Sequence, residues 1–322
     1  MRSTSRVSAA AVGLAVALAL TGCSGTTASP TVSPTSGATP TTSAPPATPT
    51  SVATSSPESD RAFRVLERDH GARIGVVAID TGTGRQVAWR AGERFAFAST
   101  NKVFIAAALL ARSSDADLDT VVHYDRADLV AHAPVTSQSV DTGMTVRALL
   151  DAMLRSSDNT AANLLVERVG GPGEVQRFLR DLGDRTTNVD RVEPELNEAT
   201  PGDARDTTTP AQFAADLRDV LLGSALDPSD RRMVRETMLG NTTGDATIRA
   251  GVDPGWSVAD KTGTGSYGVR NDIGIVSPTG RSPIVVVVMT SKDTADAEPD
   301  DALVAAATRT AVTAAGSPPS AR

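Results

Sequence analysis

The order of strand-like and helix-like segments along this 322-residue chain constrains its fold more than any other sequence feature. Five short apolar segments have the pattern of β-strands, two near the start of the folded part and three near its end. They are residues 73–80, 86–91, 256–260, 269–276 and 283–290. Strands from both ends of a chain can meet in one antiparallel sheet if the residues between them form their own helices. The pattern therefore predicts an α/β (α+β) fold: an antiparallel sheet from both termini, flanked by helices, with an inserted all-helical domain.

Helical periodicity accounts for most of the other folded residues. One helix is predicted for residues 60–70, before the first strand, and another for residues 300–315, after the last. Between them, helices are predicted at residues 144–154 and 160–169, and after the cap-proline pairs Thr209-Pro210 and Asp227-Pro228. A cleft between the sheet and the inserted helices would be a common place for a ligand site.

Residues 1–22 have the pattern of an export signal, because arginines precede an apolar run that is short for a bilayer span. The run ends at Leu20-Thr21-Gly22-Cys23, which resembles the lipobox of bacterial lipoproteins. Cleavage there would leave Cys23 as a lipidated N-terminus, and several acyl chains such as palmitate would give stable anchoring. We therefore expect an exported protein anchored to the outer face of the cell membrane. An ordinary signal peptide, cut elsewhere and releasing the protein, is the alternative.

Residues 24–57 consist almost wholly of Ser, Thr, Pro, Ala and Gly and carry no charge. Such a segment buries too little apolar surface to offset its ordering entropy, so residues 23–57 are predicted to be a lipid-bearing tether. The folded part is predicted to span residues 58–322. Within it, the sheet-containing part would be residues 58–125 and 241–322, and the all-α part residues 126–240.

Charge and metal-ligand chemistry exclude several classes of function. A formal net charge of −7 argues against a nucleic-acid partner. The three histidines lack metal-ligand spacing and cannot be combined with the single cysteine into a zinc site. We expect no metal, no cofactor and no intrachain disulfide, and we expect a monomer.

Ser99 and Lys102 are the first candidates for catalysis. They lie at the start of a helical pattern that continues through residues 103–110, and Lys102 lies three positions after Ser99, so both side chains project from one side of the first turn. A serine hydroxyl becomes a good nucleophile when a nearby base takes its proton, and an amine with a lowered pKa can do so. The backbone N–H groups of a helix start can also stabilise an oxyanion. The alternative is a capping serine beside a solvated lysine.

Lysine usage favours the catalytic interpretation. Only three of the 31 basic residues are lysines, at positions 102, 261 and 292. Arginine cannot be deprotonated in a protein, whereas a buried lysine shifts its pKa readily. A chain that uses arginine almost everywhere thus has a lysine where an amine base would be needed.

Three further groups carry candidate chemistry. Ser157-Asp158-Asn159 lies at a break between two helices, where a helix cap is the alternative. Glu193 and Asn197 lie in the polar loop of residues 184–209, which is long for a compact domain; long loops are often functional, and a solvated acidic loop is the alternative. Lys261-Thr262-Gly263-Thr264-Gly265 ends a predicted strand, where a hairpin turn is the alternative.

In this order, Ser-x-x-Lys, Ser-Asp-Asn, Glu-x-x-Leu-Asn and Lys-Thr-Gly make the chain closely resemble a class A serine β-lactamase from about residue 60 to 315. The segments 95–102, 157–165, 241–244 and 267–274 share this resemblance. It implies the β-lactamase and penicillin-binding-protein fold. It also implies hydrolysis of the β-lactam ring of penicillin- or cephalosporin-type antibiotics through a serine acyl-enzyme.

The resemblance assigns the steps of the reaction to individual residues. Ser99 would attack the lactam carbonyl, and the N–H groups of Ser99 and Thr264 would form the oxyanion hole. Ser157 would pass a proton to the departing nitrogen. Glu193, with Asn197, would activate the water that hydrolyses the ester. Whether Lys102 or Glu193 accepts the proton during acylation stays open.

The resemblance also implies how the substrate binds. Asn159 would orient Lys102 and the acylamide side chain of the substrate. Lys261, Thr262, Gly263 and Thr264 would hold the substrate carboxylate, assisted by Arg270, because a guanidinium suits a carboxylate.

Two positions depart from the family pattern. His132 stands where the family often has tyrosine or tryptophan at the cleft mouth, so substrate stacking there is in question. Ala98 excludes the disulfide of some carbapenem-hydrolysing relatives and disfavours a carbapenemase.

Other functions fit less well. Residues 263–268 match a dinucleotide fingerprint but precede a strand-like run, and the nucleophile elbow of α/β-hydrolases is missing from the sequence. A penicillin-binding DD-peptidase would lack the pair formed by Glu193 and Asn197. A non-catalytic surface lipoprotein that binds wall fragments would not need Ser99, Lys102 and Glu193.

Overall fold

The computed structural model describes residues 56–316. The predicted export signal, Cys23 and the tether up to residue 55 lie outside the described residues. No helix between residues 56 and 316 combines the length and the apolar character that a membrane span needs.

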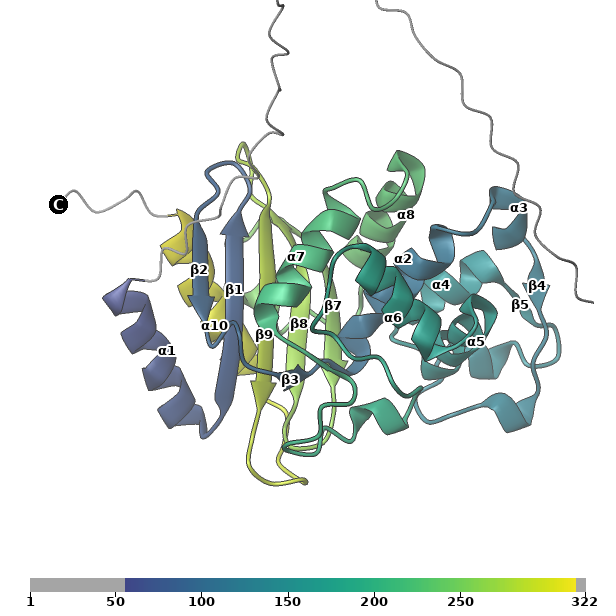
Figure 1. The fold of residues 1–322 in the computed structure, drawn as a ribbon, viewed down its shortest axis with the longest axis horizontal. Helices are drawn as coiled ribbons and strands as arrows, with labels where there is room; N and C mark the ends of the chain where they lie inside the picture. The colour runs from purple at the N-terminus through teal and green to yellow at the C-terminus, as the bar shows by residue number, and fades with distance from the viewer. Residues whose placement is uncertain (1–55, 317–322) are drawn as a thin grey trace, which may run out of the picture. The chain divides into compact units, whose positions relative to one another are not determined.

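A single five-stranded sheet is built from both ends of the described chain, in the order β2-β1-β9-β8-β7 (Figure 1). Its strands are β1 (Arg73–Asp80), β2 (Gln86–Trp89), β7 (Ser257–Thr264), β8 (Arg270–Ser277) and β9 (Ile284–Ser291). Every neighbouring pair is antiparallel. The predicted fold class is thereby confirmed.

Strand β7 is longer than the sequence predicted. It pairs with β8 from Ser257 opposite Ser277 to Thr264 opposite Arg270, so the Lys-Thr-Gly segment lies inside the ladder and the turn begins after it. The backbone N–H and C=O groups of this segment form hydrogen bonds with β8. A local sequence pattern does not reveal such a partner strand. The Lys-Thr-Gly segment is therefore part of a rigid strand rather than a hairpin turn.

Both faces of the sheet are buried, which explains its Val- and Ile-rich strands. Along β9, Ile284, Val286 and Val288 pack with α1 (Pro57–His70) and α10 (Asp301–Gly316). The alternate residues of β9 belong to a second cluster that includes α7 (Pro210–Leu221) and the inserted helices. Alternating side chains thus join two helical layers to one sheet.

The inserted helices lie beyond β7, at the opposite end of the sheet from α1 (Figure 1). The longer ones are α2 (Lys102–Leu110), α4 (Val146–Arg155), α5 (Asn159–Val169), α6 (Pro172–Asp181) and α8 (Pro228–Leu239). Short turns of helix are η1 (Ala98–Asn101), α3 (Asp115–Leu118), η2 (Arg126–Asp128), η3 (Thr136–Gln138), η4 (Glu195–Asn197) and α9 (Ile248–Gly251). Two short strand pairs join β3 (Phe95–Ala96) to β6 (Thr207–Thr208) and β4 (Val121–Val122) to β5 (Met144–Thr145).

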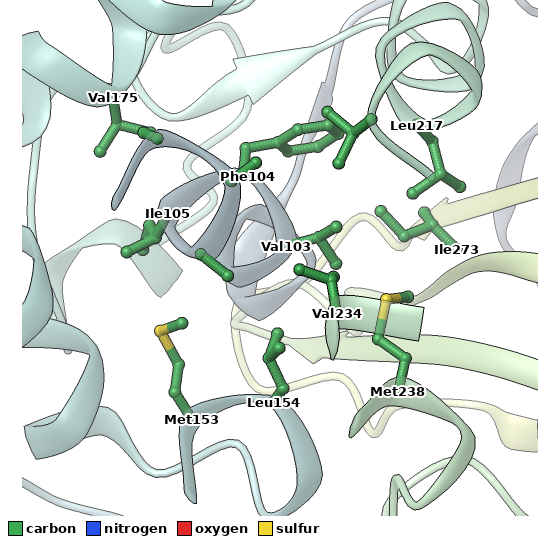
Figure 2. Close-up of a cluster of buried hydrophobic side chains, with 14 of the residues drawn as sticks. Val103, Phe104, Ile105, Met153, Leu154, Val175, Leu217, Val234, Met238 and Ile273 are labelled. Carbon is green, nitrogen blue, oxygen red and sulfur yellow. The ribbon is translucent and has the colours of Figure 1, made fainter. Parts of the chain in front are cut away.

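Helix α2 is the centre of the inserted helices, and all nine of its residues are buried. It packs against α4, α5, α6 and α8, and Figure 2 shows its apolar side chains among those of the surrounding elements. A helix that is apolar on every side is typical of a core position. Although α2 lies in the range assigned to the sheet-containing part, it packs among the helices, whereas α7 packs on β1 and β9. The predicted division into two parts stays a prediction.

Replacing Phe104 on α2 should destabilise the fold strongly. Its ring is fully buried and lies 4.7 Å from the ring of Phe213 on α7, so Phe104→Ala would leave a cavity that the neighbours cannot fill. We expect the free energy of unfolding, measured by urea denaturation, to fall by about 3–5 kcal/mol. Val121→Ala is the control, because that side chain is 49% exposed. Similar losses from the two variants would contradict the central role of α2.

Candidate active site

A cleft of about 340 Å³ contains most of the candidate residues on its walls. It is lined by Ser99, His132, Ser157, Asn159, Asn197, Thr243, Thr262, Gly263, Thr264 and Arg270. Lys102, Glu193 and Lys261 are buried, and each forms a hydrogen bond with one of these residues. The structure therefore brings together all the candidate residues that lie between positions 56 and 316.

Ser99 lies in the turn of 3₁₀-helix η1, immediately before α2, and does not cap that helix. Asn271 on β8 holds the preceding segment in place, since its amide Nδ2 donates to the carbonyl oxygens of Ala96 (2.8 Å) and Phe97 (3.2 Å). Gly263 on β7 is needed here: a Cβ atom at this position would lie 2.9 Å from the Phe97 oxygen and 3.1 Å from the Ser99 nitrogen. Because Gly263 has no side chain, β7 can lie this close to the backbone of Ser99.

One carboxylate oxygen joins the serine to the lysine. The Ser99 hydroxyl donates to Oε1 of Glu193 at 3.0 Å, and Nζ of Lys102 lies 3.0 Å from the same oxygen. Lys102 is 1% exposed and Glu193 is 2% exposed. Both groups that could take the serine proton are therefore buried side chains next to Ser99.

The environment of Lys102 lowers the pKa of its amine. Burial lowers the pKa of the amine, and the nearby Glu193 carboxylate opposes that effect without cancelling it. Nζ also donates to Oδ1 of Asn159 (2.6 Å) and to the carbonyl oxygen of Ser157 (2.8 Å), which hold the amine in position. An amine with a lowered pKa is better matched to proton transfer near neutral pH.

Ser157 lies between two lysines. Its Oγ is 3.0 Å from Nζ of Lys261 and 3.3 Å from Nζ of Lys102. Burial, and then the charge of Lys102, lower the pKa of Lys261 to about 7. A hydroxyl between two such amines is well placed to relay a proton.

Asp158 fixes the two residues that flank it. It is fully buried and caps α5, accepting from the N–H of Ala161 at 2.9 Å, while its other oxygen accepts from the N–H groups of Val135 and Thr136. The cap expected as the alternative at this motif therefore exists, and it leaves Ser157 and Asn159 facing the cleft.

His132 lies exposed at the cleft wall with a positive φ of 62°. The N–H of Asn159 donates to its carbonyl oxygen at 2.9 Å, and its Nε2 lies 3.0 Å from the carbonyl oxygen of Ser156. The imidazole is thus held at the wall of the cleft.

The loop of residues 184–209 carries Glu193 into the site. Asn163 on α5 binds both sides of the Glu193 main chain: it accepts from the N–H at 2.9 Å and donates to the carbonyl at 2.8 Å. Nδ2 of Asn197 donates to the second carboxylate oxygen of Glu193. The sequence reasoning missed Asn163, although its place one helical turn after Asn159 puts both on one face of α5.

Arg270 on β8 forms the cationic end of the cleft. It donates to Thr264 Oγ1 (3.2 Å) and to the carbonyl oxygen of Thr243 (3.0 Å), and its Nε pairs with Asp301 on α10. Asp301 was missed because it is remote in sequence from the recognised motifs, and Thr243, which lies in the family-like segment 241–244, was given no role in the sequence analysis. With Lys261, Thr262 and Thr264 nearby, this end of the cleft suits an anion.

No group of three or more potential metal-ligating side chains occurs within residues 56–316.

Known proteins resemble this chain over almost all of its described part. A family model described as the β-lactamase enzyme family matches residues 58–315. A β-lactamase of Amycolatopsis lactamdurans is 50% identical over 260 residues, covering 81% of this chain and 86% of that protein. The structure of a β-lactamase from Desulfarculus baarsii superimposes with a TM-score of 0.79 at 40% identity, covering 81% of this chain and 98% of that one. A class A β-lactamase structure from Clostridium kluyveri gives a TM-score of 0.78 at 44% identity, with 79% and 97% covered.

Removing the Asn163 side chain should loosen the loop. Asn163→Ala breaks both hydrogen bonds to the Glu193 main chain, so we expect the free energy of unfolding to fall by about 1–3 kcal/mol. Hydrogen exchange at amides of the loop should accelerate as well. Asn188→Ala, which removes one exposed bond to Ala204, is the control and should cost less than about 1 kcal/mol. Equal protection of the loop in wild type and Asn163→Ala would contradict this role.

Proposed function

We propose a mechanism from the premise that this chain belongs to the class A serine β-lactamase family. It is a β-lactam amidohydrolase, an enzyme that opens the β-lactam ring and so inactivates the antibiotic. The observation that carries the mechanism is the single Glu193 oxygen that lies 3.0 Å from both the Ser99 hydroxyl and the Lys102 amine. This contact places a nucleophile, an amine and a carboxylate within one proton-transfer network.

Acylation begins when Ser99 Oγ attacks the lactam carbonyl carbon and gives its proton to the Lys102–Glu193 pair. The N–H groups of Ser99 and Thr264 stabilise the oxyanion, each contributing a few kcal/mol to lowering the barrier. The ring C–N bond then breaks, and Ser157 donates its proton to the departing nitrogen while Lys102 or Lys261 replaces it. The two lysines lie 3.3 and 3.0 Å from the Ser157 oxygen, which supports this relay.

Deacylation uses the same carboxylate. Glu193 takes a proton from a water molecule, the resulting hydroxide attacks the ester carbon, and Ser99 leaves with a proton returned through the network. Asn197 holds the second carboxylate oxygen of Glu193 and also lines the cleft, so it can orient that water. Proton transfer by a positioned group of this kind typically contributes 10²–10⁴-fold, on the order of 3–5 kcal/mol.

Penicillins and cephalosporins are the proposed substrates. Their carboxylate would bind to Lys261, Thr262, Thr264 and Arg270, with Gly263 leaving room beside the strand, and Asn159 would bind the acylamide group. Ala98 cannot form a disulfide, which disfavours carbapenems as preferred substrates.

Two rival functions are less well supported. A DD-peptidase would release a lactam acyl group slowly, and the pair of buried Glu193 and half-buried Asn197 beside Ser99 supports fast release instead. A non-catalytic lipoprotein that binds wall fragments would show no turnover in a steady-state assay with a penicillin.

The proposed location is the outer face of the cell membrane, with Cys23 as a lipid anchor and residues 24–57 as a tether. The lipobox-like sequence supports this proposal. A monomer is proposed as the functional unit.

Glu193→Ala should separate the two half-reactions. Because Lys102 remains near Ser99, the variant should still acylate, whereas loss of the water-activating carboxylate should reduce kcat with a penicillin by at least about 10²-fold. Mass spectrometry should then show a protein mass increased by that of the penicillin. Glu195→Ala, an exposed carboxylate in the same loop, is the matched control. Turnover by Glu193→Ala at the wild-type rate would refute the deacylation step.

Lys261 should make substrate capture dependent on pH. Because its pKa is about 7, the positive charge that attracts the substrate carboxylate is present at lower pH and is lost as pH rises through about 7. We expect wild-type kcat/KM for a penicillin to decline from pH 7 to pH 9. An arginine keeps its charge, so Lys261→Arg should decline less steeply over that range. Parallel pH profiles for the two proteins would contradict this assignment.

A further inference from the structure

Two carboxyl groups that the mechanism does not use lie together at the base of the loop that carries Glu193. Asp184 begins this loop after α6, and Asp216 projects from α7; they are 0% and 2% exposed. Oδ1 of Asp184 accepts from the N–H groups of Thr186 (2.6 Å) and Thr187 (3.0 Å), whereas Oδ1 of Asp216 accepts from Gln212 (2.9 Å). The second oxygen of each group is buried and has no other donor, and the two side chains are in hydrogen-bonding contact with each other.

The charges around this pair do not balance two carboxylates. Arg180 on α6 lies 3.7 Å from Asp184, but it also donates to the carbonyl oxygens of Asp184 and Thr187. Arg94 binds the carbonyl oxygen of Thr186, and Asp219 on α7 adds a further negative charge. Strands β1, β8 and β9 and helix α8 contribute apolar side chains to the core cluster around α7, such as Val77, Val234 and Val287. The buried charged residues of these elements, Asp80 and Asp272, are both acids.

We propose that Asp184 and Asp216 share one proton at neutral pH, and that Asp216 thereby positions the loop that carries Glu193. Its catalytic consequence rests on the proposed role of Glu193 in deacylation.

The physical argument starts from the two buried oxygens that have no other donor. Two carboxylates in contact inside a protein cannot both stay ionised, because each disfavours the charge of the other. A buried acceptor without a donor costs about 1–3 kcal/mol, and a proton on Asp216 would satisfy the Asp184 oxygen. Burial and the neighbouring Asp184 raise the pKa of Asp216 to about 8, in keeping with a neutral acid at pH 7.

The pair is connected to the active site through the base of the loop. Thr187, held by Asp184, forms a hydroxyl hydrogen bond of 2.7 Å to Thr208, and the N–H of Asn188 donates to the carbonyl oxygen of Thr207. Thr207 and Thr208 form β6, which pairs with β3 (Phe95–Ala96) just before Ser99. Mutual repulsion of the two acids would therefore loosen the point where both ends of the loop are joined.

The direction of the pH effect follows from the raised pKa. An acid whose pKa is higher in the folded protein than in the unfolded chain stabilises the fold while it keeps its proton. For Asp216 this stabilisation is complete below its ordinary pKa of 3.8, declines as pH rises, and is lost above about pH 8. The loop should then be least well held in mildly alkaline solution.

Asp216→Asn tests the proposal, because the amide has the shape of the protonated acid and can donate to Asp184 at every pH. Asp219→Asn, on the same helix and 45% exposed, is the matched control. Infrared difference spectra at pH 7 should show one protonated carboxyl band in wild type and Asp219→Asn that Asp216→Asn lacks. This readout and the melting temperature do not require turnover, so they test the shared proton even if the proposed function fails.

Stability and kinetics give the further readouts. Between pH 5.5 and 9, the melting temperature of wild type should fall by roughly 5 °C or more relative to Asp216→Asn, and the two should converge at acid pH. The ratio of kcat for Asp216→Asn to kcat for wild type, with a penicillin, should rise by roughly threefold over pH 7–9.5 while KM changes little. The corresponding ratio for Asp219→Asn should stay constant.

Three outcomes would overturn the proposal. They are the absence of a carboxyl band that depends on Asp216, a kcat ratio for Asp216→Asn that does not change with pH, and failure of Asp216→Asn to fold. The last would mean that the folded protein requires a charged Asp216.

Discussion

The buried contact between Lys102 and Glu193 is the interaction on which the rest of the site depends. Removing two opposite charges from water costs several kcal/mol per ion, and attraction between them offsets this only when further hydrogen bonds complete the site. Asn159 supplies one such bond to the lysine, and Asn197 and Ser99 supply bonds to the carboxylate. A buried ion pair is weak evidence for stability, so its presence beside a serine is better explained by chemistry.

The packing of the fold holds Lys102 and Glu193 in contact. Helix α2 is surrounded by apolar side chains, so the lysine at its start has almost no freedom to move toward water. Glu193 has no helix or strand of its own and depends on Asn163 for its position. A rigid helix therefore faces a loop that is held by side-chain contacts, and changes in the loop should affect catalysis more readily than changes in the helix.

Local patterns predicted the elements well, and long-range contacts explain what they missed. Strand β1 has the predicted bounds, and α7 and α8 begin at the prolines that marked them. Strand β7 extends past its predicted end because β8 supplies partners that a local pattern does not contain. Motif spacing identified the candidate residues that the structure brings together around the cleft. It could not identify Asn271, whose contact with the segment before Ser99 spans more than 170 residues of sequence.

Buried acids in this protein occur in two electrostatic environments. Asp206 lies 2.5 Å from the guanidinium of Arg191, which suits a charged carboxylate. Asp272 on β8 has no cation in hydrogen-bonding contact, and burial, with Asp260 nearby, raises its pKa well above the usual range. Asp272 and Asp260 oppose the lowering of the Lys261 pKa that burial and the charge of Lys102 produce. The buried acids thus help Lys261 to keep the charge that the proposed binding of the substrate carboxylate requires.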